Sequence, residues 1–502
     1  MMKERFIWML AAILTCSAMM LTACSSNDNP SPSPTPTPPT PPSPQAQKGT
    51  YVWGSTIYEM GADGAARLAE AYEKTGIQHV ILLVKGEGGT IGYFKNPLSN
   101  APKTRTDRDI LEETITAMHA KGIKVYAWLT VGIDGAYQEA HPEQSSYHFR
   151  RGFCEEYMDV SQTDYHQYMA NIIKEIDQNY DVDGFALDYV RYDGPYYGWS
   201  ENEYKLLTKS AANGGYGLTL DEYNELVTLL AKQYDYSISP NEEGRLVYDV
   251  NGEVPEHKDD ALYTAYDEGV KGAVAFGDMR EDIIDDIAEF LVSQTSKPTY
   301  LASMSECTTA PNIATVAYGL TFNQAYTFDV VCPMLYSVDY EEDATWVTQN
   351  INYLKDLGYK TVIPSLQAYR DGSTETLAAD VQATINTGCQ GYLLFRTGTY
   401  DIASSVRTSN NTIELTYVRG TDNTCGNITI TISGATPTNV TMGGMLADTP
   451  YTLNGQKITF NADALEKMAD YGTVTIQTSD NSDLTISVTS DERIVYNAPM
   501  EK

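Results

Sequence analysis

The strongest constraint on the fold is an alternation of short β-rich runs with amphipathic helical runs between residues 51 and 402. Such alternation predicts a parallel sheet with crossover helices. The helix expected before the third strand shows the pattern, since Ile110, Leu111, Ile115 and Met118 fall on one face. Eight runs are predicted as strands: 51–54, 79–84, 123–129, 183–189, 298–304, 329–336, 360–366 and 389–395.

Eight strand–helix units predict an α/β fold, a (β/α)8 TIM barrel with an insertion after strand four. A plain barrel needs only about 250 residues. The surplus lies mostly between Asp193 and Lys297, where a helix is expected over 221–236 and a polar loop over 239–260. A doubly wound open sheet is the alternative. It would be favoured by a phosphate-binding loop after the first strand, and residues 51–58 contain no such loop.

The C-terminal part of the chain has a different rhythm. After about residue 408 the helical period disappears, and apolar and polar residues alternate between Gly, Asn and Asp turns. We expect a barrel domain over 50–405 and a C-terminal all-β immunoglobulin-like sandwich over 408–502. An exposed aromatic row is not evident, which favours a structural or docking module over a sugar-binding one. The predicted strands are 412–418, 427–433, 457–461, 473–478 and 484–489.

The N-terminus has the features of a secretory signal. A short basic start precedes the apolar run Phe6–Leu21, so residues 1–23 are predicted to be a signal peptide. Leu21-Thr-Ala-Cys24 resembles the bacterial lipobox, which implies lipidation of Cys24; ordinary secretion is the alternative. Residues 24–49 form a Pro/Ser/Thr-rich linker, expected to be extended. The chain is therefore expected in the bacterial cell envelope, with the outer membrane favoured, and to touch membrane only through this anchor.

Composition excludes several functions. With 67 acidic and 34 basic residues the formal charge is -33, and such a surface repels a phosphate backbone, so no nucleic acid partner is expected. The seven cysteines form no CxxC pair and the six histidines no HExxH motif, so we expect neither a metal nor a cofactor. A G-x-S-x-G elbow is also absent from the sequence, which argues against an esterase. The sequence makes no prediction of oligomeric state.

The fourth strand carries the main catalytic candidate. Strand alternation places Ala186 and Asp188 on one side, and the small residues Gly184 and Ala186 indicate the barrel interior. Asp188 should then project into the mouth at the C-terminal ends of the strands, where barrel enzymes have their active sites. Arg191 is expected to lower the pKa of Asp188 and keep it ionised. A buried Asp188–Arg191 pair that only pins the strand end is the structural alternative.

Several segments of the barrel region, taken together, resemble a known protein family. They are His119–Leu129, His141–Glu143, Tyr180–Tyr192, Arg280, Pro333–Tyr336 and Gly391–Phe395. In this order they resemble the bacterial glycosyl-hydrolase-like 10 family. The resemblance implies a barrel related to α-amylase-type and galactosidase-type hydrolases, with a carbohydrate as substrate or ligand. Two parts depart from the family pattern: the long insertion after strand four, and Ser303–Cys307, which replaces a Ser-Pro-Phe-Gly-like run.

Glycoside hydrolysis normally uses two carboxyl groups. We expect Asp188 to be the nucleophile or catalytic base. Glu306 follows strand five in phase with Met304, at the place where amylase-like barrels carry their acid, and Asp339 after strand six is nearly as plausible. Other carboxylates at strand ends are better explained as solvated loop residues: Glu87, Asp134 and Asp193.

Aromatic side chains after the strands suit sugar binding, because rings stack on sugar C–H faces and the Tyr hydroxyl can hydrogen-bond. A non-catalytic carbohydrate-binding surface lipoprotein is the main alternative function, and an envelope protein acting through its sandwich is another. Trp53 and Trp128 could line the pocket floor or belong to the core. The predicted substrate-binding residues are Arg191, Tyr189, Tyr192, Lys85, Trp128 and Tyr336.

Overall fold

The fold is described from a computed structural model. It describes residues 47–91, 103–104, 108–149, 157–248, 257–321, 327–359, 361–368, 374–395, 405–406, 414–419, 428–433, 436–445, 451–460, 468–479 and 483–488. The predicted signal peptide, Cys24 and most of the predicted linker lie outside these ranges. None of the helices in the described ranges combines the length and apolarity needed to cross a membrane.

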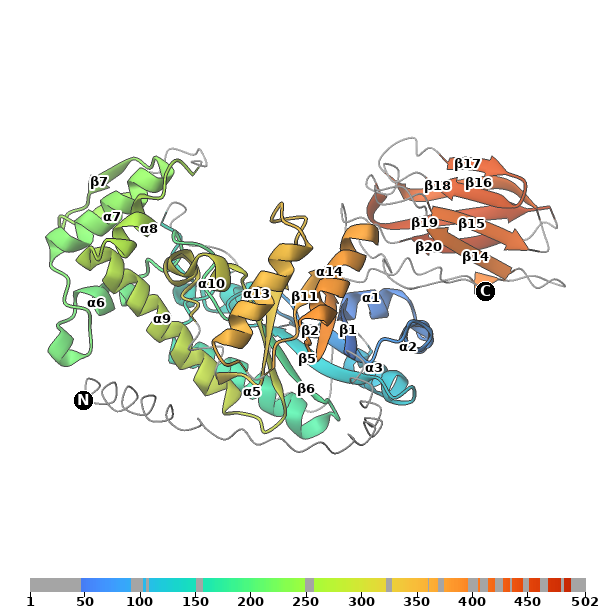
Figure 1. The fold of residues 1–502 in the computed structure, drawn as a ribbon, viewed down its shortest axis with the longest axis horizontal. Coiled ribbons are helices and arrows are strands. Elements are labelled where there is room, and N and C mark those ends of the chain that lie inside the picture. Colours follow the sequence, from blue (N-terminus) through green and yellow to red (C-terminus); the bar gives the residue numbers. More distant parts are fainter. Residues whose placement is uncertain are drawn as a thin grey trace, which may run out of the picture. The chain divides into compact units, whose positions relative to one another are not determined.

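Eight parallel strands close into a barrel (Figure 1), because β1 pairs with both β2 and β12. The predicted TIM barrel is confirmed and the open sheet is excluded. The seventh strand is shorter than predicted, and β1 begins within the predicted linker. In barrel order the strands are β1 Gln47–Trp53, β2 His79–Lys85, β5 Lys124–Thr130, β6 Gly184–Asp188, β9 Thr299–Ser303, β10 Val330–Leu335, β11 Ser365–Gln367 and β12 Gly391–Phe395.

Alternation along each strand divides the core into two layers. Tyr51, Tyr126, Ala186 and Tyr300 belong to one cluster contributed by the barrel strands alone, while their neighbours along the strands pack with the helices. Gly184 fits where a larger residue would not. A Cβ there would lie 2.4 Å from the Pro298 carbonyl oxygen and 2.8 Å from the Tyr126 ring.

Amphipathic helices cover the barrel. The face predicted for α3 is confirmed, since Ile110, Leu111, Ile115 and Met118 are all buried, and the Asp109 side chain caps its N-terminus by accepting from the Glu112 N–H. The helices outside the insertion are α1 Gly54–Glu59, α2 Gly64–Thr75, α3 Ile110–His119, α4 Gly135–Ala140, α5 Thr163–Asn179, α10 Glu306–Thr309, α11 Pro311–Ile313, α13 Ala344–Asp356 and α14 Thr374–Asn386.

The insertion after the fourth barrel strand is mainly helical. The helix expected over 221–236 is confirmed as α7. The expectation of a loop over 239–260 is wrong in part, because a short β7–β8 hairpin forms around its start. Between β6 and β9 the elements are α6 Glu201–Thr208, α7 Leu220–Tyr234, β7 Ile238–Pro240, β8 Leu246–Tyr248, α8 Ala261–Asp267 and α9 Lys271–Val292.

Arg280 of α9 fixes the segment that follows β6. Its guanidinium is fully buried and donates to the carbonyl oxygens of Tyr197 (2.6 Å), Gly194 (2.9 Å) and Ala317 (2.5 Å). It also lies 3.8 Å from the centre of the Tyr192 ring. Burial lowers the pKa of Arg280 to about 10, so it stays charged at neutral pH. One side chain thus joins the loop after β6, helix α9 and the turn ending at residue 318.

The C-terminal strands pair into two four-stranded antiparallel sheets (Figure 1). The five predicted strands correspond to β14, β15, β18, β19 and β20, whereas β13, β16 and β17 were not predicted. An immunoglobulin-like sandwich remains a prediction. One sheet contains β13 Ser405–Val406, β20 Asp483–Val488, β19 Met468–Thr478 and β16 Pro437–Met445, and the other β14 Glu414–Arg419, β15 Ile428–Ser433, β18 Lys457–Phe460 and β17 Tyr451–Asn454.

Replacing Arg280 with Met should destabilise the barrel, because three hydrogen bonds to buried carbonyl oxygens would be lost. We expect the free energy of unfolding to fall by about 3 kcal/mol or more, seen as a lower thermal midpoint by circular dichroism. Lys205→Met, which removes an exposed cation on α6, is the control and should leave the midpoint nearly unchanged. Equal midpoints for the two variants would contradict this role for Arg280.

Candidate active site

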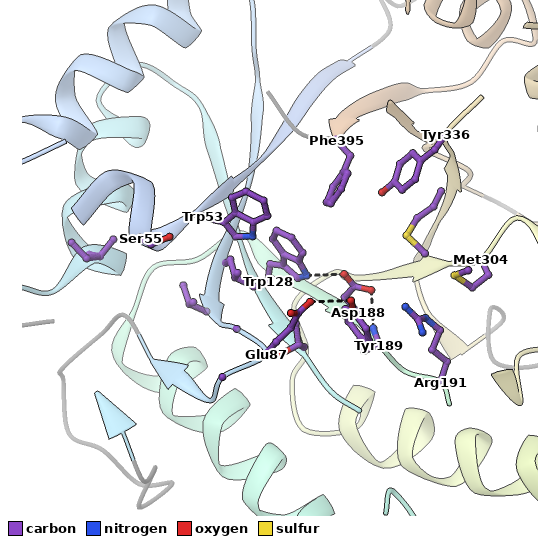
Figure 2. Close-up of a pocket in the computed structure, with 18 of the residues that line it drawn as sticks. Trp53, Ser55, Glu87, Trp128, Asp188, Tyr189, Arg191, Met304, Tyr336 and Phe395 are labelled. Carbon is purple, nitrogen blue, oxygen red and sulfur yellow. Dashed lines mark hydrogen bonds between the residues drawn. The ribbon is translucent and has the colours of Figure 1, made fainter. Parts of the chain in front are cut away.

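A cavity of about 770 Å³ opens at the C-terminal ends of the barrel strands. This size is typical of small-molecule sites. Its walls are largely aromatic: Trp53 ends β1, Trp128 lies near the end of β5, Tyr336 follows β10 and Phe395 ends β12 (Figure 2). The Tyr336 and Phe395 rings stack at 5.1 Å.

Asp188 lies at the inner end of this cavity. It is the last residue of β6 and only 7% exposed. Its Oδ1 accepts from the Tyr189 backbone N–H at 2.7 Å, and its Oδ2 accepts from the Trp128 indole Nε1 at 3.2 Å (Figure 2). The predicted alternation is confirmed, since Ala186 belongs to the barrel interior and Asp188 lines the cavity above it.

The expectation that Arg191 would lower the pKa of Asp188 is wrong in its net direction. Burial raises the pKa of the Asp188 carboxyl, and this outweighs the opposing effects of Arg191 and the two hydrogen bonds. Arg191 forms its ion pair with Asp193, with 2.6 Å between Nη1 and Oδ1. Its guanidinium lies 4.3 Å from the centre of the Tyr189 ring. The structural alternative, a direct Asp188–Arg191 pair, is therefore not what pins the strand end.

Among the residues that the structure describes, Glu87 is the other carboxylate that lines the cavity. It is exposed in the loop after β2, and its Oε1 accepts from the Tyr189 hydroxyl at 2.9 Å (Figure 2). The charge of Glu87 also contributes to raising the pKa of Asp188. From the sequence, Glu87 lies at a strand end and is expected to be a solvated loop residue without a role in the site. The signal that could have identified it is its place between Gly86 and Gly88, which lets the backbone of the loop lie along the cavity.

Glu306 does not line this cavity. Strand β9 ends at Ser303, and Ser305 already has helical backbone angles (φ −67°, ψ −24°) at the start of α10. The alternation that placed Glu306 in phase with Met304 therefore stops before reaching it. Its carboxylate accepts from the Tyr340 hydroxyl at 3.0 Å, beside the cavity wall.

Asp339 is also outside the cavity lining. It is exposed in the turn after β10, and its Oδ1 accepts from the Gln367 side-chain amide at 2.8 Å. The Asp339 backbone N–H donates back to the Gln367 side chain at 3.1 Å. These two bonds indicate that Asp339 orders the turn between β10 and α13.

Four of the predicted substrate-binding residues line the cavity: Trp128, Tyr189, Arg191 and Tyr336. Tyr192 does not, because its side chain is 3% exposed and its hydroxyl donates to Glu203 at 2.9 Å within the insertion. Its place beneath Arg280 makes it part of the packing that holds the loop after β6.

Lys85, predicted to bind substrate, is buried and does not line the cavity. Its ammonium is 0% exposed, lies 3.1 Å from Asp134 Oδ2, and donates to the carbonyls of Thr130 (2.6 Å) and Ile133 (2.9 Å). Burial lowers the pKa of Lys85, and Asp134 opposes this shift. The pair joins the end of β2 to the loop after β5, so it positions the strand that precedes the Glu87 loop and the strand that carries Trp128.

Within the described ranges, no group of three or more His, Cys, Asp or Glu side chains is arranged to hold a metal ion. What the cavity offers is two carboxyl groups in different surroundings, Asp188 buried and Glu87 exposed. Such a pair can donate a proton at one position and accept one at the other.

Comparison with known proteins supports a hydrolase domain. Residues 51–214 match a family model described as "Putative glycosyl hydrolase domain". The matched segment contains both cavity carboxylates, Glu87 and Asp188, with the aromatic residues Trp53 and Trp128. No curated protein matches the chain.

Several solved structures are similar to the chain. The PgaB (BpsB) glycoside hydrolase domain from Bordetella bronchiseptica is 15% identical, covers 70% of this chain and 93% of its own, and has a TM-score of 0.45. The catalytic domain of β-amylase from Paenibacillus polymyxa is 10% identical, with 70% and 92% covered and a TM-score of 0.47. The β-galactosidase from the psychrophilic Marinomonas ef1 is 11% identical, with 70% and 54% covered and a TM-score of 0.41.

Replacing Lys85 with Met should destabilise the fold, because the buried Asp134 would lose its counter-ion. A loss of about 3–5 kcal/mol in the free energy of unfolding is expected, measured by urea denaturation. The double variant Lys85→Met with Asp134→Asn is the matched control and should recover part of the loss. If Lys85→Met instead leaves stability unchanged and weakens glycan binding alone, Lys85 acts on the ligand as the sequence suggested.

Proposed function

We propose that the barrel is a glycoside hydrolase that acts on a poly- or oligosaccharide through Asp188 and Glu87. The observation that carries the proposal is that both carboxyl groups line one aromatic-walled cavity and are bridged by Tyr189. The family match over residues 51–214 and the resemblance to glycosyl-hydrolase-like 10 proteins support the same reaction class.

The two carboxyl groups divide the reaction between them. Asp188 is the general acid, because burial raises its pKa and favours the protonated form. It donates its proton to the glycosidic oxygen as the bond to the anomeric carbon breaks. Glu87, exposed at the rim, takes a proton from the attacking water or attacks the anomeric carbon itself. This assignment reverses the role expected for Asp188 from the sequence.

The cavity walls supply binding. Trp53, Trp128, Tyr336 and Phe395 present faces or edges on which sugar rings can pack. The Trp128 indole has a second task, since its N–H is directed at Asp188. A sugar seated against these rings would lie between the buried acid and the exposed carboxylate.

The N-terminal sequence adds a location to the proposal. A lipid on Cys24 and an extended linker would hold the barrel away from the bilayer in the cell envelope, within reach of a polymeric glycan. Outer-membrane placement and the glycosyl-hydrolase-like 10 assignment are part of the same proposal.

Substituting Asp188 with Asn, or Glu87 with Gln, should lower kcat on a cleaved glycan about 100-fold or more, because each removes an acid–base group with little change of shape. Release of reducing ends from a glycan panel is the measurement. Glu143→Gln, at an exposed carboxylate after β5, is the control and should retain activity. Binding without turnover by the wild type would support the non-catalytic lectin-like alternative. Loss of turnover in Glu306→Gln but not in Glu87→Gln would restore the pair predicted from the sequence.

The pH profile should follow from these roles. Asp188 must be protonated to act, so kcat/KM should fall as pH rises through its raised pKa. The alkaline limb should therefore lie above the ordinary Asp pKa of about 3.9. Trp128→Phe removes a hydrogen bond that favours the ionised form, so it should move this limb to higher pH. An alkaline limb that stays in place in this variant would rule out Asp188 as the acid.

A further inference from the structure

Tyr189 has an unusual backbone for its residue type. Its φ is 53°, in the left-handed region that a bulky side chain rarely adopts. The residue follows β6 directly and contacts both cavity carboxylates. Strained positions of this kind gather at functional sites, where surrounding contacts hold them.

The contacts of Tyr189 run in two directions. Its backbone N–H donates to Asp188 Oδ1 at 2.7 Å, and its hydroxyl donates to Glu87 Oε1 at 2.9 Å across the cavity. The Arg191 guanidinium, 4.3 Å from the ring centre, packs on the ring between these two ends. The left-handed turn lets one residue face the end of β6 with its backbone and the loop after β2 with its side chain.

We infer that Tyr189 is a positioning residue of this site, whose backbone N–H orients Asp188 and whose hydroxyl holds the Glu87 carboxylate in place. The inference rests on the proposed function, in which Glu87 must accept a proton or attack. It assigns Tyr189 to the geometry of the carboxyl pair, whereas the sequence suggested only contacts with a sugar.

The Tyr189 hydroxyl is the donor in this pair. Burial raises the pKa of Tyr189, with Asp188 and Glu87 adding to the shift, so the phenol remains protonated and donates its hydrogen bond to Glu87.

The test is Tyr189→Phe, which keeps the ring, the packing of Arg191 and the backbone N–H but removes the hydroxyl. Release of reducing ends, followed over a range of glycan concentrations, separates kcat from KM. We expect kcat on a cleaved glycan to fall about tenfold with little change in KM, because the ring still lines the cavity while Glu87 loses the hydrogen bond that holds it.

Tyr157→Phe is the matched control. The Tyr157 hydroxyl donates to Asp193 Oδ2 at 2.7 Å, so this variant also removes one phenol–carboxylate bond near Arg191 but leaves Glu87 untouched. Its kcat should stay close to that of the wild type. Thermal midpoints of both variants, measured alongside, separate a local effect from a loss of folding.

The outcomes distinguish this inference from the proposed function. An unchanged kcat in Tyr189→Phe, or an equal fall in Tyr157→Phe, would overturn the role of Tyr189 and leave the proposed function standing as long as Glu87→Gln loses turnover. Full turnover in Glu87→Gln would remove Glu87 from the reaction and overturn both. A fall in kcat confined to Tyr189→Phe, with little change in KM and with loss of turnover in Glu87→Gln, would support both.

Discussion

Closure of the barrel by β1, which pairs with both β2 and β12, is the constraint on which the site depends. Parallel strands in a closed ring bring all their carboxyl ends to one rim. Trp128 of β5, Asp188 of β6 and the loop after β2 with Glu87 therefore meet over one cavity although they are far apart in the chain. The same closure buries Asp188, and this burial sets the direction of its pKa.

The buried cations stabilise the surroundings of the cavity rather than offering a free charge to a ligand. Lys85 is paired with Asp134, Arg191 with Asp193, and Arg280 with three backbone carbonyls. Lys85 and Arg280 join segments from different barrel units, whereas the Arg191–Asp193 pair lies within the loop after β6. The chain carries a formal charge of -33 and has few basic residues, and three of these residues form the buried contacts described here.

The candidate site was predictable only as far as strand geometry extends. Asp188 and Trp128 lie within strands, where the two-residue period places a side chain reliably. Glu306 and Asp339 follow strand ends, where α10 and a turn begin, and there the period no longer holds. Lys85 is the last residue of its strand, and its ammonium pairs with the buried Asp134. The sequence alone does not predict this pair, because the two residues are far apart in the chain. Glu87 is linked to the site by a hydrogen bond that its side chain accepts from the Tyr189 hydroxyl, in the loop after β6.

Local pattern in the sequence determined the eight barrel strands, their helices, the site of the insertion and the inward face of β6, because periodicity and turn residues are properties of neighbouring positions. Tertiary structure decided which carboxylate lines the cavity with Asp188, which cations are buried, and in which direction the pKa of Asp188 is shifted. Those outcomes depend on desolvation and on hydrogen bonds between distant segments, and such energies exist only once the chain has folded.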